Sequence, residues 1–149
     1  MINHTQAKEH LKSLTLLLVE DEWQTQKMLR EFLQRLVAVV ITASNGAEGL
    51  DAYREHAPDI VLTDIQMPVM DGLTMVREIR SLDNGTAVPI FILTAFEEVD
   101  YIKTGASLGA EEFLSKPINT SKCVESLLRC AGELLGKSKR HVQKIKGAI

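Results

Sequence analysis

The sequence predicts an α/β fold in which helices cover both faces of a doubly wound, five-stranded parallel sheet. Two observations lead to this prediction. Five short runs rich in Val, Ile and Leu alternate with longer segments of helical periodicity. Most of these runs also lack the strict alternation of a strand with one solvent-facing side, which indicates burial on both faces. Alternating strands and helices are then joined by right-handed crossovers between parallel strands.

The predicted strands are short and apolar along most of their length. The first covers residues 14–19 (LTLLLV) and the second covers 39–43 (VVITA). They are followed by IVLT at 60–63, VPIFILT at 88–94 and EFLS at 112–115. In sheets of this kind, functional side chains lie at the carboxyl ends of the strands. The residues just after each run are therefore the candidates for a site.

Helices are predicted between these runs, over 23–36, 47–56, 73–82, 98–108 and 120–135. The first of them has apolar residues at the three- and four-residue steps of a helix. Glycines flank the others and mark their ends. Asp71 is predicted to cap the helix that begins at 73, and Gly72 to supply an unusual backbone angle.

The length of 149 residues fits one domain. All the predicted strands and helices lie within 14–135, so this range is the predicted domain. Residues 1–13 are then an N-terminal extension, and 136–149 are a basic C-terminal tail or the start of a signalling helix or linker.

Composition narrows the function classes. Apolar residues make up 45% of the chain and charged residues 25%, the balance of a soluble globular protein. The net charge of −3 gives no direct indication of nucleic-acid binding. No apolar run reaches the roughly 18 residues of a membrane span, and the first residues lack the apolar core of a signal peptide. We therefore expect a cytoplasmic protein with no membrane contact.

The two cysteines are expected to be reduced thiols. Cys123 and Cys130 lie on one predicted helix, about 10 Å apart along its axis, whereas a disulfide requires Cα atoms within about 7 Å. The histidines are scattered without the spacing of metal ligands, so they predict no metal site.

Polar residues of complementary kinds follow the predicted strands. Glu20 and Asp21 follow the first, Asp64 the third, Thr94 ends the fourth, and Lys116 follows the fifth. Crowded carboxylates raise one another's pKa, and a hard cation such as Mg²⁺ relieves this because it takes oxygen ligands and bridges carboxylates to phosphate. The chemistry that fits is phosphoryl transfer to a carboxylate, with the lysine and threonine contacting the phosphoryl oxygens.

At these positions the chain resembles the receiver domains of two-component response regulators. The segment TDIQMPVMDG at 63–72 is similar to their phosphoacceptor loop, D-x-x-M-P-x-M-D-G. VEDE at 19–22 resembles their first-strand acidic pair, Thr94-Ala95 their switch hydroxyl, and FLSKP at 113–117 their last strand with its lysine. The resemblance covers 14–135. It implies the flavodoxin-like (βα)5 fold of chemotaxis receivers, with strand order 2-1-3-4-5.

The resemblance also implies a role for each residue at the acceptor site. Asp64 would be the phosphoacceptor, and a sensor histidine kinase or phosphotransfer protein would be the donor. Mg²⁺, or Mn²⁺, would be bound directly by Asp21 and Asp64, by Glu20 in an outer or water-mediated role, and by the backbone carbonyl of Gln66. Glu20 stands where an aspartate is more usual.

Other residues would act after phosphorylation. Thr94 and Lys116 would contact the phosphoryl group, and Thr94 and Phe113 would form the switch, although many receivers have tyrosine in place of Phe113. Gln66 and Phe96 would tune the lifetime of the phosphorylated form. A cis bond is expected at Lys116-Pro117. Such a domain is a signalling module rather than an enzyme, although it assists its own phosphorylation and dephosphorylation.

Three functional alternatives remain. The chain could be the phosphoacceptor switch of a larger regulator whose output domain is absent here, a stand-alone protein–protein binding module, or a pseudo-receiver that acts without phosphorylation. The intact acceptor-site residues count against the pseudo-receiver. A Rossmann or P-loop site would need a glycine-rich turn after the first strand, and a haloacid-dehalogenase-type phosphatase would need D-x-D-x-T, in which Gln66 occupies the second aspartate's place.

The C-terminal segment 136–149 carries five Lys and Arg and no acid. Apolar residues follow one another at steps of four and three that run into it, with Ser138 the one polar interruption: Val124, Leu128, Ala131, Leu135, Val142, Ile145 and Ile149. Such a seam is typical of a helix that pairs with a second copy, giving a homodimer, or that leads to an output domain. The alternative is a frayed basic tail.

Overall fold

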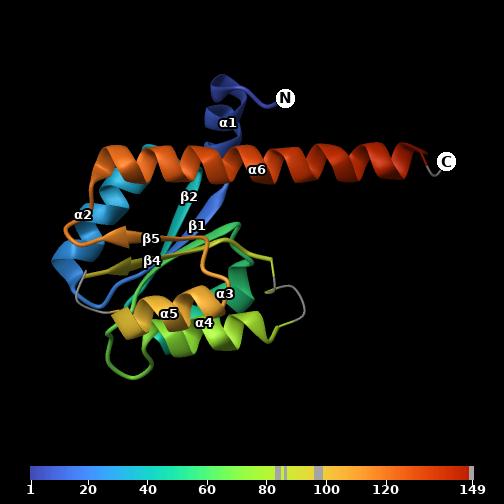
Figure 1. The fold of residues 1–149 in the computed structure, drawn as a ribbon. Helices are drawn as coiled ribbons and strands as arrows, with labels where there is room; N and C mark the ends of the chain where they lie inside the picture. Colours follow the sequence, from blue (N-terminus) through green and yellow to red (C-terminus); the bar gives the residue numbers. More distant parts are fainter. Residues whose placement is uncertain (83–84, 86, 96–98, 148–149) are drawn as a thin grey trace.

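The computed structural model describes residues 1–82, 85, 87–95 and 99–147. Five parallel strands form one sheet in the order β2-β1-β3-β4-β5, which confirms the predicted fold (Figure 1). The strands are β1 (Thr15–Val19), β2 (Val39–Ala43), β3 (Ile60–Asp64), β4 (Ile90–Thr94) and β5 (Glu112–Ser115). Their carboxyl ends lie along one edge of the sheet because all five run in the same direction.

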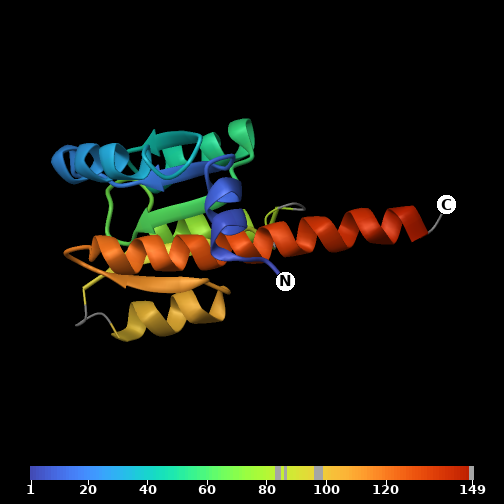
Figure 2. The same cartoon turned by 90° about the horizontal axis from the view of Figure 1, so that it is seen from above.

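The helices lie on both faces of the sheet. They are α1 (His4–Leu11), α2 (Trp23–Leu33), α3 (Gly46–His56), α4 (Gly72–Arg80), α5 (Val99–Ser107) and α6 (Thr120–Gly147). One face carries α2 and α6, and the other carries α3, α4 and α5 (Figures 1 and 2). Within the described residues no helix combines the length and the apolar character that crossing a membrane requires.

Each central strand contributes to two cores because its successive side chains face opposite sides of the sheet. Leu16 and Leu18 of β1 join the core under α2 and α6, whereas Leu17 and Val19 join the core under α3 and α4. These residues are fully buried. The apolar runs without alternation in the sequence are thus explained by helices on both faces.

Several element boundaries differ from the predicted ones. Strand β4 begins at Ile90 rather than 88, after Pro89, which has no backbone N–H to donate. Helix α2 ends at Leu33 rather than 36, because the next residues form tight turns such as the bond from Leu36 N to the Leu33 carbonyl at 2.9 Å. Helix α5 is described from Val99 to Ser107, and residue 98 of its predicted range lies outside the described residues.

Helix α1 was not predicted: residues 1–13 were expected to be an N-terminal extension, with no helix assigned to them. Asn3 caps it: its side chain accepts from Gln6 N at 2.9 Å, and the Gln6 side chain accepts from Asn3 N at 2.9 Å. Ala7 and Leu11 are buried, and the helix packs against α6. So short a helix is marginal in water by itself, so the contact with α6 stabilises it.

The structure also extends the last helix, which continues past the predicted end at 135 to Gly147. Helix α1 lies over the first part of the predicted apolar seam, since Leu11 and Lys8 share a cavity with Val124 and Leu128. Only the later seam residues project away from the domain, with Val142 46% and Ile145 50% exposed. Ile149 lies outside the described residues. The seam therefore does not form one continuous exposed surface.

Truncating Leu11 tests whether α1 belongs to the folded domain. This side chain is 1% exposed in the core beside α6, so Leu11→Ala is expected to lower the free energy of unfolding by about 2–5 kcal/mol. Urea denaturation would measure the change. Lys8→Ala, on the exposed side of the same helix, should change stability by less than about 0.5 kcal/mol. Equal, small effects of both substitutions would mean that α1 does not contribute to the core.

Candidate functional site

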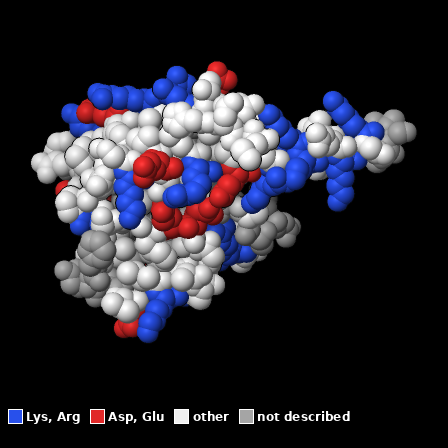
Figure 3. All heavy atoms as spheres, turned by 45° about the horizontal axis from the view of Figure 1, so that its top comes forward, with Lys and Arg blue, Asp and Glu red and all other residues white. Residues whose placement is uncertain are grey.

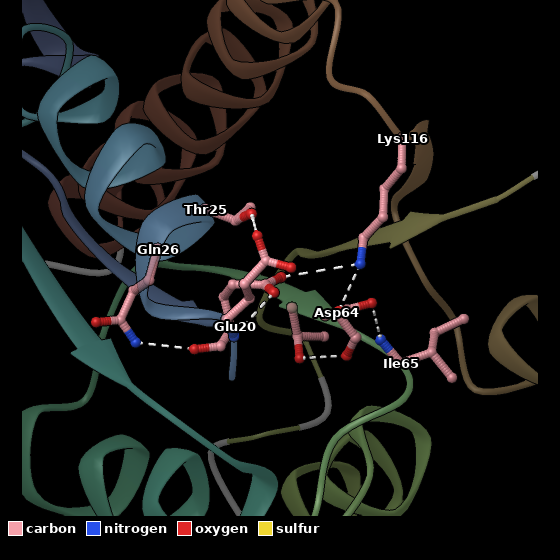
Figure 4. A network of polar contacts seen from close by, with 8 residues as sticks. Glu20, Thr25, Gln26, Asp64, Ile65 and Lys116 are labelled. Atoms are coloured by element: carbon pink, nitrogen blue, oxygen red, sulfur yellow. Dashed lines mark hydrogen bonds and ion pairs between the residues drawn. The ribbon is translucent and has the colours of Figure 1, made fainter.

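Side chains from three strands meet at the carboxyl edge of the sheet (Figure 4). Glu20 follows β1, Asp64 ends β3, and Lys116 follows β5. The Lys116 Nζ lies 2.5 Å from Asp64 Oδ2 and 3.9 Å from Glu20 Oε2. The peptide bond between Lys116 and Pro117 is cis, as predicted. One ammonium group therefore contacts two carboxylates that are far apart in the sequence.

Asp64 is buried, with 6% of its surface exposed. Its Oδ1 accepts a hydrogen bond from Ile65 N at 2.7 Å, and its Oδ2 pairs with Lys116. Both oxygens are thus oriented, one by the backbone and one by a cation. A carboxylate held in this way has a defined direction of attack.

Gly72 holds the loop that follows Asp64, although not for the predicted reason. Its backbone angle is not unusual; the left-handed residue of this loop is Val69, with φ 68°. Gly72 N donates to the Ile65 carbonyl at 2.7 Å, and a Cβ at this position would collide with the Asp64 carbonyl oxygen. Glycine is required here by the close approach of two backbones. Asp71 caps α4 as predicted, accepting from Thr74 N at 2.7 Å.

Glu20 is a buried carboxylate with too few hydrogen-bond donors around it to offset the cost of its burial. It is 2% exposed, and its Oε1 accepts only a long bond from Glu22 N at 3.3 Å. Its Oε2 has no hydrogen-bond partner among the described residues. Desolvation and then the charge of Asp64 raise the pKa of Glu20 to about 7, and Lys116 offsets part of that rise. A cation at this position would relieve the cost of ionising Glu20.

Three carboxylates converge here on a single ammonium. Glu20, Asp21 and Asp64 each offer an oxygen, and these oxygens all lie within 4.8 Å of one another. Burial by itself would lower the pKa of Lys116, but its hydrogen bond to Asp64 and the charges of all three acids raise it overall. Asp21 is exposed. A cluster of oxygen donors with excess negative charge suits a hard divalent cation.

Thr94 and Phe113 lie on the neighbouring strands β4 and β5. Thr94 is buried, its Oγ1 donates to the Ala95 carbonyl at 3.0 Å, and its own carbonyl accepts from Lys116 N at 3.0 Å. Phe113 pairs in register with Ile92, two residues before Thr94. A Cβ on Gly105 would lie 2.9 Å from the Phe113 ring, so this ring packs against α5. The backbone of Thr94 is thus bonded to the lysine, and Phe113 lies between the strands and α5.

Gln66 is exposed at the rim, and its Nε2 lies 3.5 Å from the Tyr101 hydroxyl of α5. Phe96 lies outside the described residues. The sequence did not identify Gln26, whose Nε2 donates to the Glu20 carbonyl at 2.9 Å (Figure 4) and to the Ala43 carbonyl at 3.1 Å. Gln26 thereby ties the ends of β1 and β2 together. No local signal could have found it, because a glutamine on an amphipathic helix is ordinarily solvated.

A cavity of about 210 Å³ opens beside the acidic cluster, between α2 and the segment after β5. It is lined by Glu20, Glu22, Thr25, Met28, Leu29, Leu93, Lys116, Pro117 and Ile118. Met28 is 54% exposed at its edge. One side of the cluster therefore borders an apolar surface on α2.

The chain is similar in sequence to proteins of one known family. Residues 16–128 match the family model of the response regulator receiver domain. The chemotaxis protein CheY of Bacillus subtilis is 32% identical over 113 residues, which cover 75% of this chain and 92% of CheY. The probable C4-dicarboxylate response regulator DctR of Priestia megaterium is 31% identical over 118 residues, or 78% of this chain and 51% of DctR. The chain thus spans about half the length of DctR.

One solved structure that is similar to this chain contains a bound metal ion. The receiver domain of a sensor histidine kinase from Pseudomonas aeruginosa PAO1, with a magnesium ion coordinated in its active-site cleft, is 30% identical to this chain. The similarity covers 80% of this chain and 98% of that domain, with a TM-score of 0.73.

Proposed function

This chain belongs to the response regulator receiver domain family, and we propose that it accepts a phosphoryl group on Asp64 in a reaction that requires Mg²⁺ or Mn²⁺. One observation carries the proposal: Asp64 is oriented by Ile65 N and Lys116 beside two further carboxylates, and Oε2 of Glu20 has no hydrogen-bond partner among the described residues. Attack of an Asp64 oxygen on the phosphorus forms the acyl phosphate, and the bond from phosphorus to the donor's leaving atom breaks.

The residues present fit a divalent cation. Asp21, Asp64 and the backbone carbonyl of Gln66 would hold it directly, with Glu20 in an outer or water-mediated role. When bound, the cation would neutralise the charge of the carboxylates and of the phosphoryl oxygens. The unsatisfied Oε2 of Glu20 supports this assignment, because a buried oxygen without a donor costs free energy.

We further propose that Lys116 and Thr94 act on the phosphoryl group once it is attached. Lys116 already contacts the oxygen to which the phosphoryl group would bond, and would move to a phosphoryl oxygen. Thr94 would exchange its bond to the Ala95 carbonyl for one to the phosphoryl group. Phe113 would then change rotamer beside α5, which would remodel the surface formed by α5, β5 and α6.

The phosphoryl donor is proposed to be a histidine kinase or a phosphotransfer protein. The product is a changed surface rather than a released metabolite, so the domain works as a switch. Because the chain spans about half of DctR but nearly all of CheY, both a role within a larger regulator and a stand-alone role fit the proposal.

Removal of the metal tests this function directly. Incubation with acetyl phosphate and Mg²⁺ is expected to add one phosphoryl group per chain, detected by intact mass. Chelation of the metal should prevent the adduct within the same incubation, because the three carboxylates would then repel the incoming phosphate. A folded protein that binds Mg²⁺ but forms no adduct would instead indicate a pseudo-receiver that acts by binding alone.

A further inference from the structure

Helix α6 consists of two halves in different surroundings. It has 28 residues and is therefore about 42 Å long. Cys123, Leu127 and Ala131 in its first half are buried in the core, whereas residues 137–147 are exposed and project from the domain (Figures 1 and 2). At its start, Lys137 and Arg140 line a groove with the beginning of α1, and residues 141–147 beyond them are exposed. A helical segment as short as these eleven projecting residues gains little stability in water without a partner to pack against.

The projecting half is strongly basic. It carries five of the 17 Lys and Arg in the chain and none of the 20 Asp and Glu, so the rest of the chain has an excess of negative charge. Figure 3 shows only basic charged side chains along the projecting half, and acidic side chains gathered, with basic ones among them, on the domain beside it. The first half of α6 carries two bases and two acids, so the negative charge beside it comes from Glu133 together with Glu111 and Glu112 at the start of β5. The basic projecting half is complementary to this acidic group.

The acidic side chains beside the first half lack sufficient cations. Desolvation, followed by the charge of Glu133 and a hydrogen bond to it, raises the pKa of Glu111, and the charge of Lys137 offsets only part of that rise. Glu112 Oε1 pairs with Arg129 at 3.3 Å, but its Oε2 has no hydrogen-bond partner among the described residues. An additional cation from outside the chain would stabilise this group of like charges.

A groove of about 530 Å³ runs along α6 where the two halves meet, with the start of α1 as its opposite wall. Its lining includes Ile2, Ala7, Gly132, Glu133, Gly136 and Arg140. Gly132 and Gly136 lack side chains that would fill it. A helix approaching this side of α6 could come close to its backbone, on a different side from the apolar seam that α1 covers.

We propose that two copies of this chain pair through antiparallel α6 helices, with Gly136 near a two-fold axis and the basic half of each helix along the acidic side of the other. This register sets Glu133 opposite Arg140 of the second copy, and by symmetry Arg140 opposite Glu133. A parallel pair would instead place two basic halves together. The pairing depends on α6 alone and would occur whether or not Asp64 is phosphorylated.

Sedimentation equilibrium of the full chain is the first test. A dimer is expected at low ionic strength, and it should dissociate as salt rises because the contacts between copies are exposed ion pairs. A monomer at every concentration and salt, or a dimer indifferent to salt, would overturn the proposal.

A charge exchange tests the register. Glu133→Arg and Arg140→Glu should each weaken the dimer by about tenfold or more, because each sets like charges opposite one another. The double variant should recover to within about threefold of the original dissociation constant, because it restores opposite pairs. Lys27→Glu, with the same charge change as Arg140→Glu at an exposed position of α2, is the control. Failure of the double variant to recover would refute this register.

Cross-linking tests the direction. In the antiparallel pair, residue 145 lies about 25 Å along the helix from the same residue of the second copy, so Ile145→Cys should not form a disulfide-linked dimer. A mixture of Glu133→Cys and Arg140→Cys proteins should form one. The native thiols will not interfere, because burial raises the pKa of Cys123 to about 11 and of Cys130 to about 12. Efficient linkage through residue 145 would show a parallel pair.

Discussion

Asp64→Asn is expected to abolish the phosphoryl adduct that acetyl phosphate and Mg²⁺ form on the original protein. The amide has nearly the same shape as the carboxylate but lacks the anionic oxygen that attacks phosphorus. The variant should still fold, because its side-chain oxygen can accept from Ile65 N and the partly exposed Lys116 keeps Glu20 as a partner. Intact mass would measure the adduct, and circular dichroism the folding.

The control is Asp51→Asn, which removes an exposed carboxylate from α3 and should leave the adduct unchanged. A phosphoryl group retained by the Asp64→Asn protein would show that another residue is the acceptor. Loss of the adduct together with loss of the folded signal would call for Asp64→Glu, which keeps the charge but displaces the nucleophile.

The second large effect is a gain in stability. In metal-free buffer at pH 8, Glu20→Gln is expected to raise the free energy of unfolding by up to about 3 kcal/mol, the equivalent of moving a pKa from 4.5 to about 7. Between pH 4.5 and 7 the folded protein keeps a proton on Glu20 that the unfolded chain releases, and at pH 8 this buried carboxyl is ionised in the folded protein at a cost in free energy. The contribution of Glu20 to stability is therefore fully present below pH 4.5 and is lost as pH rises through 7. At pH 5 the substitution should have much less effect.

Urea denaturation at the two pH values, with a chelator present, measures this difference. Asp21→Asn is the matched control, since Asp21 belongs to the same cluster but is exposed and should change stability much less. Burial assigns the larger effect to Glu20, which is 2% exposed. An equal gain at pH 5 and pH 8 would show that the charge of Glu20 is not the cause.

Sequence patterns identified the elements that carry their own signal. The three central strands, β1, β3 and β4, were predicted because both of their faces are buried, which leaves an almost uninterrupted apolar run. The candidate site was predicted because parallel strands place the residues that follow them at one edge. The sequence could not show how these residues share their charges: Glu20 is more buried than Asp64, and Lys116 contacts both.

Elements that depend on a distant contact were missed. Helix α1 is too short to be stable without α6, and its sequence is mostly polar. Gly72 was correctly identified as important for its loop, but the reason is a backbone that comes from the preceding strand. Gln26 joins the ends of two strands, and nothing in its neighbouring residues indicates that role.

The sequence alone therefore determined the alternation of strands and helices, the order of polar residues along the sheet edge and the family resemblance, because each depends on local periodicity or spacing. The tertiary structure decided which carboxylate is buried, which side of the last helix is free and why α1 forms. Burial and electrostatic environment arise from residues distant in the chain, so they become defined only when the chain is folded.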